Sequence, residues 1–285
     1  MKSWKPFNTR ALAWLTIALS MVMGPVAASP APAVIEFSSL DPDRSEHVHG
    51  TLYRPESCAA PCPAVVVVHG TAGINATGAF YREAVLQAGI AFFEVDFKTG
   101  IFTSPMDRPP AETFIPMGFA ALKELRKVPG IDPQRIGIVG FSMGGHLTVN
   151  TAFEANRRKW MGDEKGFAAH AAFYPVCKSF LSQDDLKTTG APILIFYGTA
   201  DTYGEGKNVP AFKQLLQSRY NTAITTVEYA GAQHGFNRNA PPLSYRDPAA
   251  IDGKGYMAWD EAAATDSKTR LIEFLGRTLG TAHAQ

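Results

Sequence analysis

The stretch "RIGIVGFSMGGHLTVN", residues 135–150, decides the fold. Its apolar first half predicts a buried strand, and its second half has the spacing of a helix. Ser142 therefore lies at the corner between them, close to Gly140, Gly144 and Gly145. A G-x-S-x-G pattern at such a corner exposes a serine hydroxyl at the edge of a sheet. The alternative is a serine that only caps the helix, so the rest of the chain has to distinguish the two.

Similar apolar runs occur on both sides of this corner. Residues 47–55, "HVHGTLYRP", alternate as in an outer antiparallel strand, whereas residues 64–70, "AVVVVHG", are apolar as in a strand buried on both faces. Strands alternating with helices predict an α/β fold, a mostly parallel sheet in a three-layer sandwich with helices on both faces and no large lid domain. The further predicted strands are 90–97, 170–176, 193–198 and 223–230, and the predicted helices are 77–88, 112–127, 144–158, 208–219 and 259–279.

The first residues have the pattern of a secretory signal peptide. Lys2, Lys5 and Arg10 precede the apolar run "ALAWLTIALSMVM", and the small residues of "VAASPAPA" follow. We expect cleavage after Ala28 and a periplasmic or secreted protein without stable membrane insertion; an uncleaved anchor is the alternative.

The charge balance bears on the expected partner, and export would permit a disulfide. Loss of the leader removes three positive charges and no negative ones, which lowers the formal net charge from +1 to −2. Basic patches with interleaved aromatic residues do not occur, so we expect a small molecule or a neutral polymer as partner and no nucleic acid. Cys58 and Cys62 stand close enough to form a disulfide in an oxidising compartment, and Cys177 is expected to be a buried thiol.

A serine hydroxyl becomes a nucleophile only when a base removes its proton and a third group orients that base. Of the histidines after Ser142, His234 follows the last apolar run, where a loop can bring it over the sheet edge. Asp201 directly follows the strand "ILIFYG" and "TA", as an orienting acid should. The order Ser142, Asp201, His234 is that of an α/β-hydrolase.

Stabilisation of a tetrahedral oxyanion requires backbone N–H donors. The Met143 amide follows the nucleophile, and the Thr71 amide lies in the turn "HGTAGI"; Ala72 is the alternative to Thr71. We expect His69 to shape this turn by hydrogen bonding. Tyr203 and Phe236 adjoin Asp201 and His234, so they are candidates for contacts with the substrate.

With "HGTAGIN", "GFSMGG", "YGTAD" and "AQHGF" in this order, the chain resembles the dienelactone hydrolase family of α/β-hydrolases. The resemblance extends from about residue 47 to 279. It implies esterase or lactonase activity with Ser142, Asp201 and His234 as triad and the Thr71 and Met143 amides as oxyanion hole. It also implies that Arg238 binds a substrate carboxylate. The resulting organisation is a signal peptide at 1–28, an N-terminal extension at 29–46 and a dienelactone hydrolase-like domain at 47–280.

Two departures from the family pattern narrow the expected substrate. The founding dienelactone hydrolases have a cysteine nucleophile, where this chain has Ser142, and a glutamate in the turn where it has Gly70. Their pathway is also intracellular. We therefore expect a general serine hydrolase acting on small esters or lactones, with a polymer ester also open, and not on the dienelactone itself.

Two other functions remain to be weighed against an esterase. A serine peptidase or amidase would use the same triad chemistry, and a catalytically silent binding protein would have the triad residues out of bonding distance. No metal-ligand set stands at a recognised spacing and no phosphate-binding glycine loop occurs, so we expect neither a metal nor a cofactor.

Overall fold

The protein folds around an eight-stranded sheet with the strand order β1-β2-β4-β3-β5-β6-β7-β8. The computed structural model describes residues 1, 31–44, 46–56, 58, 61–97 and 109–281; the predicted signal peptide lies outside them apart from Met1. Pairing is antiparallel between β1 and β2 and between β2 and β4, and parallel from β4 through β8. The strands are β1 (Ala33–Ser38), β2 (His47–Tyr53), β3 (Cys62–Val68), β4 (Ala91–Asp96), β5 (Ile131–Phe141), β6 (His170–Phe173), β7 (Ile193–Gly198) and β8 (Thr225–Tyr229).

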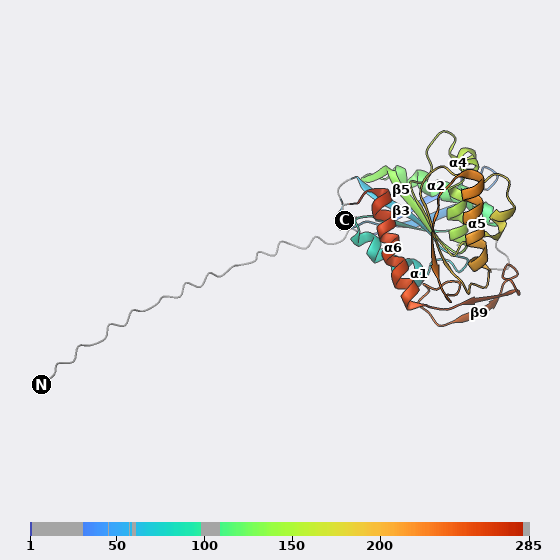
Figure 1. Ribbon diagram of the computed structural model, residues 1–285. Coiled ribbons are helices and arrows are strands. Elements are labelled where there is room, and N and C mark those ends of the chain that lie inside the picture. The colour runs from blue at the N-terminus through green and yellow to red at the C-terminus, as the bar shows by residue number, and fades with distance from the viewer. Residues whose placement is uncertain (2–30, 45, 57, 59–60, 98–108, 282–285) are drawn as a thin grey trace.

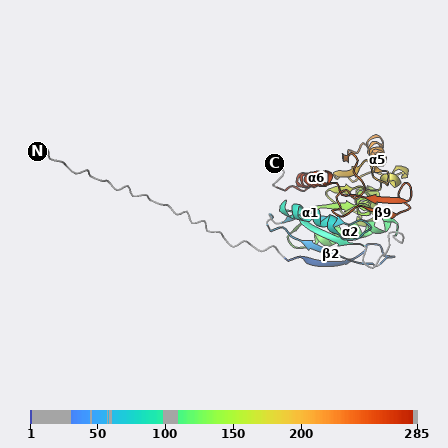
Figure 2. The same cartoon turned by 90° about the horizontal axis from the view of Figure 1, so that it is seen from below.

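Helices cover both faces of this sheet, which gives the predicted three-layer α/β fold (Figure 1). Side chains of α1 and α6 pack with one face, while those of α2, α3 and α5 pack with the other. Figure 2 shows β2 at one margin of the domain and α5 and α6 toward the opposite margin. The helices are α1 (Ala76–Gln87), α2 (Ile115–Arg126), α3 (Met143–Thr151), α4 (Glu154–Met161), α5 (Glu205–Tyr220) and α6 (Glu261–Leu279), with short 3-10 helices η1 (Ala111–Phe114) and η2 (Cys177–Ser182).

The central strands are apolar because both of their faces are covered. Every residue of β3 and β7 is buried, as expected of parallel strands between two helix layers. Local signals fix where the helices begin. The Asn75 side chain accepts a hydrogen bond from Thr77 N at the start of α1, and the Asp260 side chain accepts one from Ala263 N at the start of α6.

One predicted helix is divided in two. The sequence predicts a continuous helix over 144–158, but Phe153 adopts an extended conformation between α3 and α4 and bridges to Thr188. Two backbone hydrogen bonds fix the break, from Thr189 N to Ala152 O (2.9 Å) and from Glu154 N to Lys187 O (2.8 Å). The tertiary pairing therefore overrides the local helical pattern.

Two elements were not expected from the sequence. The segment assigned to an N-terminal extension supplies β1, which pairs with β2 at the sheet edge. A separate hairpin, β9 (Leu243–Arg246) and β10 (Lys254–Met257), follows the predicted catalytic histidine. A backbone bridge between His234 and Met257 connects this hairpin to the site.

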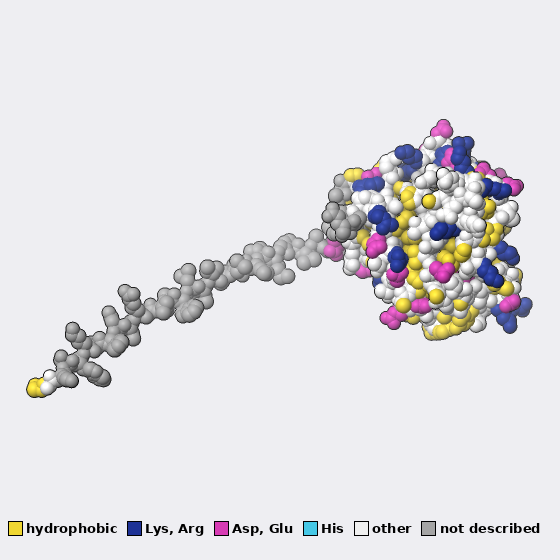
Figure 3. All heavy atoms as spheres, in the orientation of Figure 1, with side chains coloured by type: hydrophobic (Ala, Val, Ile, Leu, Met, Phe, Trp, Pro, Cys, Tyr) yellow, Lys and Arg dark blue, Asp and Glu magenta, His cyan; other side chains and the backbone are white. Residues whose placement is uncertain are grey.

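Three further features concern the cysteines, the surface charge and membrane insertion. A disulfide joins Cys58 to Cys62, and Cys177 is a buried free thiol. On the face shown in Figure 3, basic and acidic side chains are interspersed. Within the described ranges, no helix is long and apolar enough to span a membrane.

Candidate active site

Ser142 lies at a strained corner between β5 and α3. Its backbone has φ 54° and ψ −114°, a region that residues other than glycine rarely adopt. The surrounding backbone is too close for side chains: a Cβ at Gly140 would collide with the Gly144 carbonyl, and a Cβ at Gly144 with the Val68 carbonyl. The corner therefore has the geometry of a nucleophile elbow and not of an ordinary helix cap, since the Ser142 side chain makes no capping hydrogen bond.

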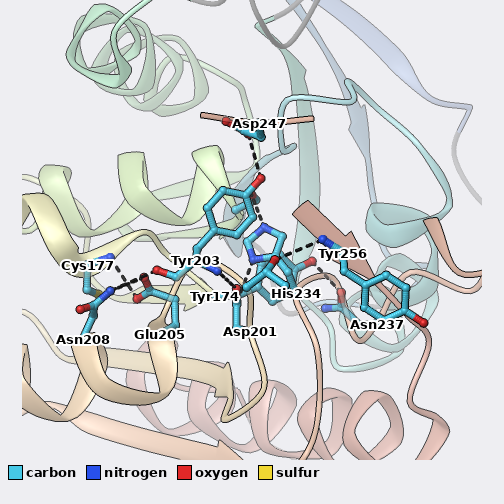
Figure 4. Close-up of polar contacts among 12 residues, drawn as sticks. Tyr174, Cys177, Asp201, Tyr203, Glu205, Asn208, His234, Asn237, Asp247 and Tyr256 are labelled. Carbon is cyan, nitrogen blue, oxygen red and sulfur yellow. Dashed lines mark hydrogen bonds and ion pairs between the residues drawn. The ribbon is translucent and has the colours of Figure 1, made fainter. Parts of the chain in front are cut away.

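The three residues predicted to form a triad are connected by hydrogen bonds. His234 Nε2 lies 2.8 Å from Ser142 Oγ, and His234 Nδ1 lies 2.8 Å from Asp201 Oδ2 (Figure 4 labels His234 and Asp201). The side chains of His234 and Asp201 are fully buried, whereas Ser142 is partly exposed. Asp201 Oδ1 also accepts a hydrogen bond from the Tyr203 backbone N–H at 2.8 Å.

These contacts assign the proton positions. An ionised carboxylate only accepts hydrogen bonds, so Nδ1 of His234 carries the proton that is donated to Asp201. Nε2 is then unprotonated and accepts the hydroxyl proton of Ser142. This is the tautomer that a general base needs in order to activate a serine.

Two tyrosines flank the His234 ring. The Tyr174 ring is 4.6 Å from the imidazole centroid in an edge-on arrangement, and the Tyr203 ring is 4.5 Å away and tilted. Tyr174 follows β6 with φ 39°, which turns its side chain toward the site. Its hydroxyl donates to Asn237 Oδ1 at 2.7 Å, and burial raises the pKa of Tyr174 well above its usual value. The Tyr174 ring is therefore held in place.

The turn after β3 brings Thr71 next to the elbow. Gly73 N donates to Gly70 O at 3.1 Å, which closes the turn. His69 accepts a hydrogen bond from Phe97 N through Nε2 (3.0 Å), so its Nδ1 carries a proton and donates to Gly70 O (2.6 Å). His69 thus shapes the turn as expected. Met143 is the first residue of α3, where an amide N–H has no partner within its own helix.

Two cavities meet at Ser142 and Thr71, which line both. The first, of about 50 Å³, also contains Tyr174 and Arg238 in its wall. The second, of about 410 Å³, contains Met143 and Tyr203. Ser142, the predicted nucleophile, therefore lines both a small cavity and a larger one.

The three residues predicted to contact the substrate do not all line the cavities. Tyr203 and Arg238 line the second and first cavity respectively, and the Arg238 guanidinium donates to Pro241 O at 3.0 Å. Phe236 has a different environment. It is fully buried, lines neither cavity and packs against Tyr174 and Tyr229, so its contact with a substrate stays a prediction.

A buried carboxyl group beside the site was missed by the sequence reasoning. Glu205, at the start of α5, accepts hydrogen bonds from Cys177 N (3.0 Å) and Asn208 Nδ2 (3.2 Å). Burial, with the nearby negative charge of Asp201, raises the pKa of Glu205 to about 8. Burial and the adjoining Glu205 also raise the pKa of the Cys177 thiol well above its usual value. Glu205 stands four residues after Asp201, but no local pattern signals that it is buried.

The described part of the chain contains no cluster of three or more His, Cys, Asp or Glu side chains placed to bind a metal ion.

Comparison with known proteins assigns the chain to a family. The model of the dienelactone hydrolase family matches residues 48–279. The chain belongs to the dienelactone hydrolase family. A protein from Klebsiella pneumoniae assigned to the dienelactone hydrolases is similar in structure, with a TM-score of 0.63 and 21% identity over 87% of this chain and 100% of the other.

Two further structures share the fold. A dienelactone hydrolase-like promiscuous phosphotriesterase from metagenomic libraries has a TM-score of 0.63 and 17% identity, covering 87% of this chain and 99% of its own. Esterase 2 of Thermogutta terrifontis, in a form phosphorylated by paraoxon, has a TM-score of 0.59 and 18% identity. The match covers 89% of this chain and 96% of the esterase chain. This chain is thus a hydrolase-family protein with the fold of known esterases.

Proposed function

We propose that this protein is an exported serine hydrolase that cleaves small carboxylic esters or lactones through an acyl-enzyme intermediate. The observation that carries the proposal is the continuous contact from Ser142 Oγ through both nitrogens of His234 to Asp201, with 2.8 Å at each step. Burial of the last two side chains keeps this arrangement away from competing water.

Acylation begins when Ser142 Oγ attacks the carbonyl carbon and its proton passes to His234 Nε2. Asp201 accepts the hydrogen bond from Nδ1 throughout and stabilises the imidazolium that forms. Collapse of the tetrahedral intermediate breaks the ester C–O bond. His234 returns the proton to the departing alcohol, which leaves an acyl group on Ser142.

Deacylation repeats these steps with water. His234 Nε2 takes one proton from a water molecule while the water oxygen attacks the acyl carbon. The C–O bond to Ser142 then breaks, the proton goes to Ser142 Oγ, and the carboxylic acid is released. In both halves we assign the oxyanion hole to the N–H groups of Thr71 and Met143, because both residues adjoin Ser142 and line the same cavity.

We assign Arg238 to recognition of a carboxylate on the substrate. It lines the first cavity near Ser142, and its guanidinium can form a bidentate pair with a carboxylate. Tyr203 forms part of the wall of the second cavity. The larger of the two cavities, of about 410 Å³, has room for a small ester or lactone, or for an exposed acyl group of a polymer.

Export is supported by two features of the chain. The first 28 residues have the charge and apolar pattern of a signal peptide, and Cys58 and Cys62 form a disulfide. Detection of the mature protein, beginning at Ser29, in a periplasmic or culture fraction tests this part of the proposal. Retention of the full-length chain in the cytoplasm would contradict it.

The activity is tested by hydrolysis of a p-nitrophenyl ester series, by reaction with an organophosphonate probe and by intact mass. The wild type should hydrolyse short esters and acquire one adduct, and Ser142→Ala should lose both. Ser179→Ala is the matched control, because Ser179 lines the second cavity but lies outside the triad. A folded wild type without turnover or adduct would indicate a binding protein, and faster cleavage of matched amides would indicate an amidase.

A further inference from the structure

The segment from Leu243 to Met257 makes contacts with the site that the proposed mechanism does not use. It contains the hairpin β9–β10 and runs beside the Asp201 turn. Ile251 N donates to Thr202 O at 3.0 Å, and Tyr256 N donates to Thr202 Oγ1 at 3.1 Å. The turn that contains Asp201 is thus connected to this hairpin by two hydrogen bonds.

Asp247 is the most unusual residue of this segment. It is a carboxylate with 3% exposure, and it lines the second cavity together with Tyr203 and Ser142. Its Oδ2 accepts the hydroxyl proton of Tyr203 at 2.8 Å, and its Oδ1 accepts the Ala249 N–H at 3.0 Å. Burial of a carboxylate is costly unless it is hydrogen-bonded, so the bond to Tyr203 stabilises a defined position of both side chains.

Tyr203 connects Asp247 to both buried members of the triad. Its backbone N–H donates to Asp201 Oδ1 at 2.8 Å, and its ring lies 4.5 Å from the imidazole centroid of His234 (Figure 4). Because its hydroxyl proton is donated to Asp247, its oxygen is left to accept the hydroxyl of Tyr245 at 3.0 Å. Tyr203 is therefore fixed at its backbone, its ring and its hydroxyl.

We infer that Asp247 and Tyr203 are positioning residues that hold the His234 imidazole in place. The inference rests on the proposed function. Tyr174 is held by Asn237 inside the core, whereas Tyr203 is held by the hairpin. The Tyr203 ring is tilted against the imidazole with the two centroids 4.5 Å apart, so the position of this ring limits where the imidazole can lie.

This arrangement gives the hairpin a specific task in catalysis. Nothing in the local sequence of Asp247 connects it with His234, and it does not touch the reacting atoms in the proposed mechanism. Its effect passes through the Tyr203 hydroxyl to the ring, and from the ring to the base. Small displacements of a catalytic base cost large factors in rate, of about 100-fold per ångström. Loss of the carboxylate should therefore lower kcat more than it raises KM.

The experiment compares Asp247→Ala, Asp247→Asn and Tyr203→Phe with wild type. We expect kcat for a p-nitrophenyl ester to fall about 10- to 100-fold in Asp247→Ala, with KM within about 3-fold. Asp247→Asn keeps an oxygen that accepts the Tyr203 hydroxyl and should retain more activity. The double variant Asp247→Ala/Tyr203→Phe should be no worse than the more severe single variant, because both remove the same link.

Tyr197→Phe is the matched control. The Tyr197 hydroxyl donates to Glu228 at 2.6 Å between β7 and β8, so this variant removes a similar tyrosine–carboxylate bond that does not involve the triad. It should leave kcat unchanged. The low-field proton resonance of the His234–Asp201 hydrogen bond gives a second readout: it should shift or broaden in Asp247→Ala and stay in place in Tyr197→Phe.

The results separate this inference from the proposed function. Ester turnover and a Ser142 adduct in the wild type establish the function whatever the variants do. With those in hand, an unchanged kcat and low-field resonance in Asp247→Ala would overturn the inference, as would a change in KM alone. If Asp247→Ala does not fold, Tyr203→Phe with unchanged kcat and resonance overturns it equally.

Discussion

The two ends of the parallel strands have opposite characters. At the carboxyl ends, Ser142 has a strained backbone, and a buried imidazole and carboxylate are held close together. At the amino ends, Arg135 extends from β5 to Pro61 O at 2.6 Å and to the carbonyls of Leu279 and Gly280 at 3.3 Å. The same strands therefore carry strain and buried charge at one end and unstrained links between chain segments at the other.

This difference indicates how the fold divides its tasks. Strained and buried polar groups cost stability, and they persist where the surrounding structure fixes them. The apolar strands and the links that Arg135 makes at the amino ends supply that support, and Arg135 lines neither cavity. Substitutions of the candidate triad residues at the carboxyl ends should therefore change activity more than stability, and substitutions at the amino ends should do the reverse.

The largest effect is expected for Ser142→Ala. Removal of the nucleophile should lower kcat by about 10⁴-fold or more, because the rest of the triad has nothing to activate. The free energy of unfolding should change by less than about 0.5 kcal/mol, since the hydroxyl fills no apolar contact. Ester kinetics and urea unfolding measure the two quantities, and a large loss of stability would break the proposed division between the two ends.

Asp201→Asn should have the next largest effect. An amide can donate to His234 Nδ1 and so favour the tautomer that cannot accept the Ser142 proton, which should lower kcat by about 10³- to 10⁴-fold. Asp184→Asn is the matched control, because Asp184 is an exposed carboxylate in the loop before β7. Steady-state kinetics of both variants test the assignment; equal activities would contradict it.

Glu205 gives a pH-dependent prediction at the carboxyl ends. Its pKa is about 8 in the folded protein, above the ordinary value of 4.5, so the unfolded chain releases this proton at a lower pH than the folded chain does. The associated stability is fully present below pH 4.5 and is lost as the pH rises to about 8. Relative to Glu205→Gln, the wild type should lose on the order of 5 kcal/mol across this range.

Urea unfolding of both proteins at intervals between pH 4.5 and 9 measures this difference. The comparison within each pH removes the contributions of other titrating groups. A difference that does not vary with pH would show that Glu205 ionises alike in the folded and unfolded states.

Arg135→Ala tests the amino ends of the strands and should have the smallest effect on activity. Arg135 also pairs with Asp132 at 2.7 Å and holds the pKa of that carboxyl below its usual value. Loss of these bonds should lower the free energy of unfolding by about 1–2 kcal/mol, because the side chain is partly solvated. Ester turnover at 25 °C should stay at the wild-type level, and a loss of activity in a folded variant would count against the division of tasks.

Much of the fold follows from local patterns in the chain. The apolar run of β3 predicts a strand buried on both faces, and the glycines around Ser142 predict a sharp corner, because both depend on neighbouring residues alone. The order of Ser142, Asp201 and His234 could also be predicted, since each stands just after an apolar run and the carboxyl ends of parallel strands share one edge.

Contacts between distant segments could not be predicted in this way. The break at Phe153 depends on a pairing with Thr188, and the ring of Phe236 enters the core although it adjoins His234 in sequence. Asp247 likewise looks like an ordinary loop carboxylate until the hairpin places it against Tyr203.

The sequence by itself determined the alternating elements, the elbow and the identity of the candidate triad, because spacing along the chain sets which residues follow each strand. Only the tertiary structure decided which side chains surround the imidazole, since burial and ring contacts depend on segments far apart in the chain. Tyr174 and Tyr203 contact His234 from two different turns, and no local sequence pattern predicts these contacts.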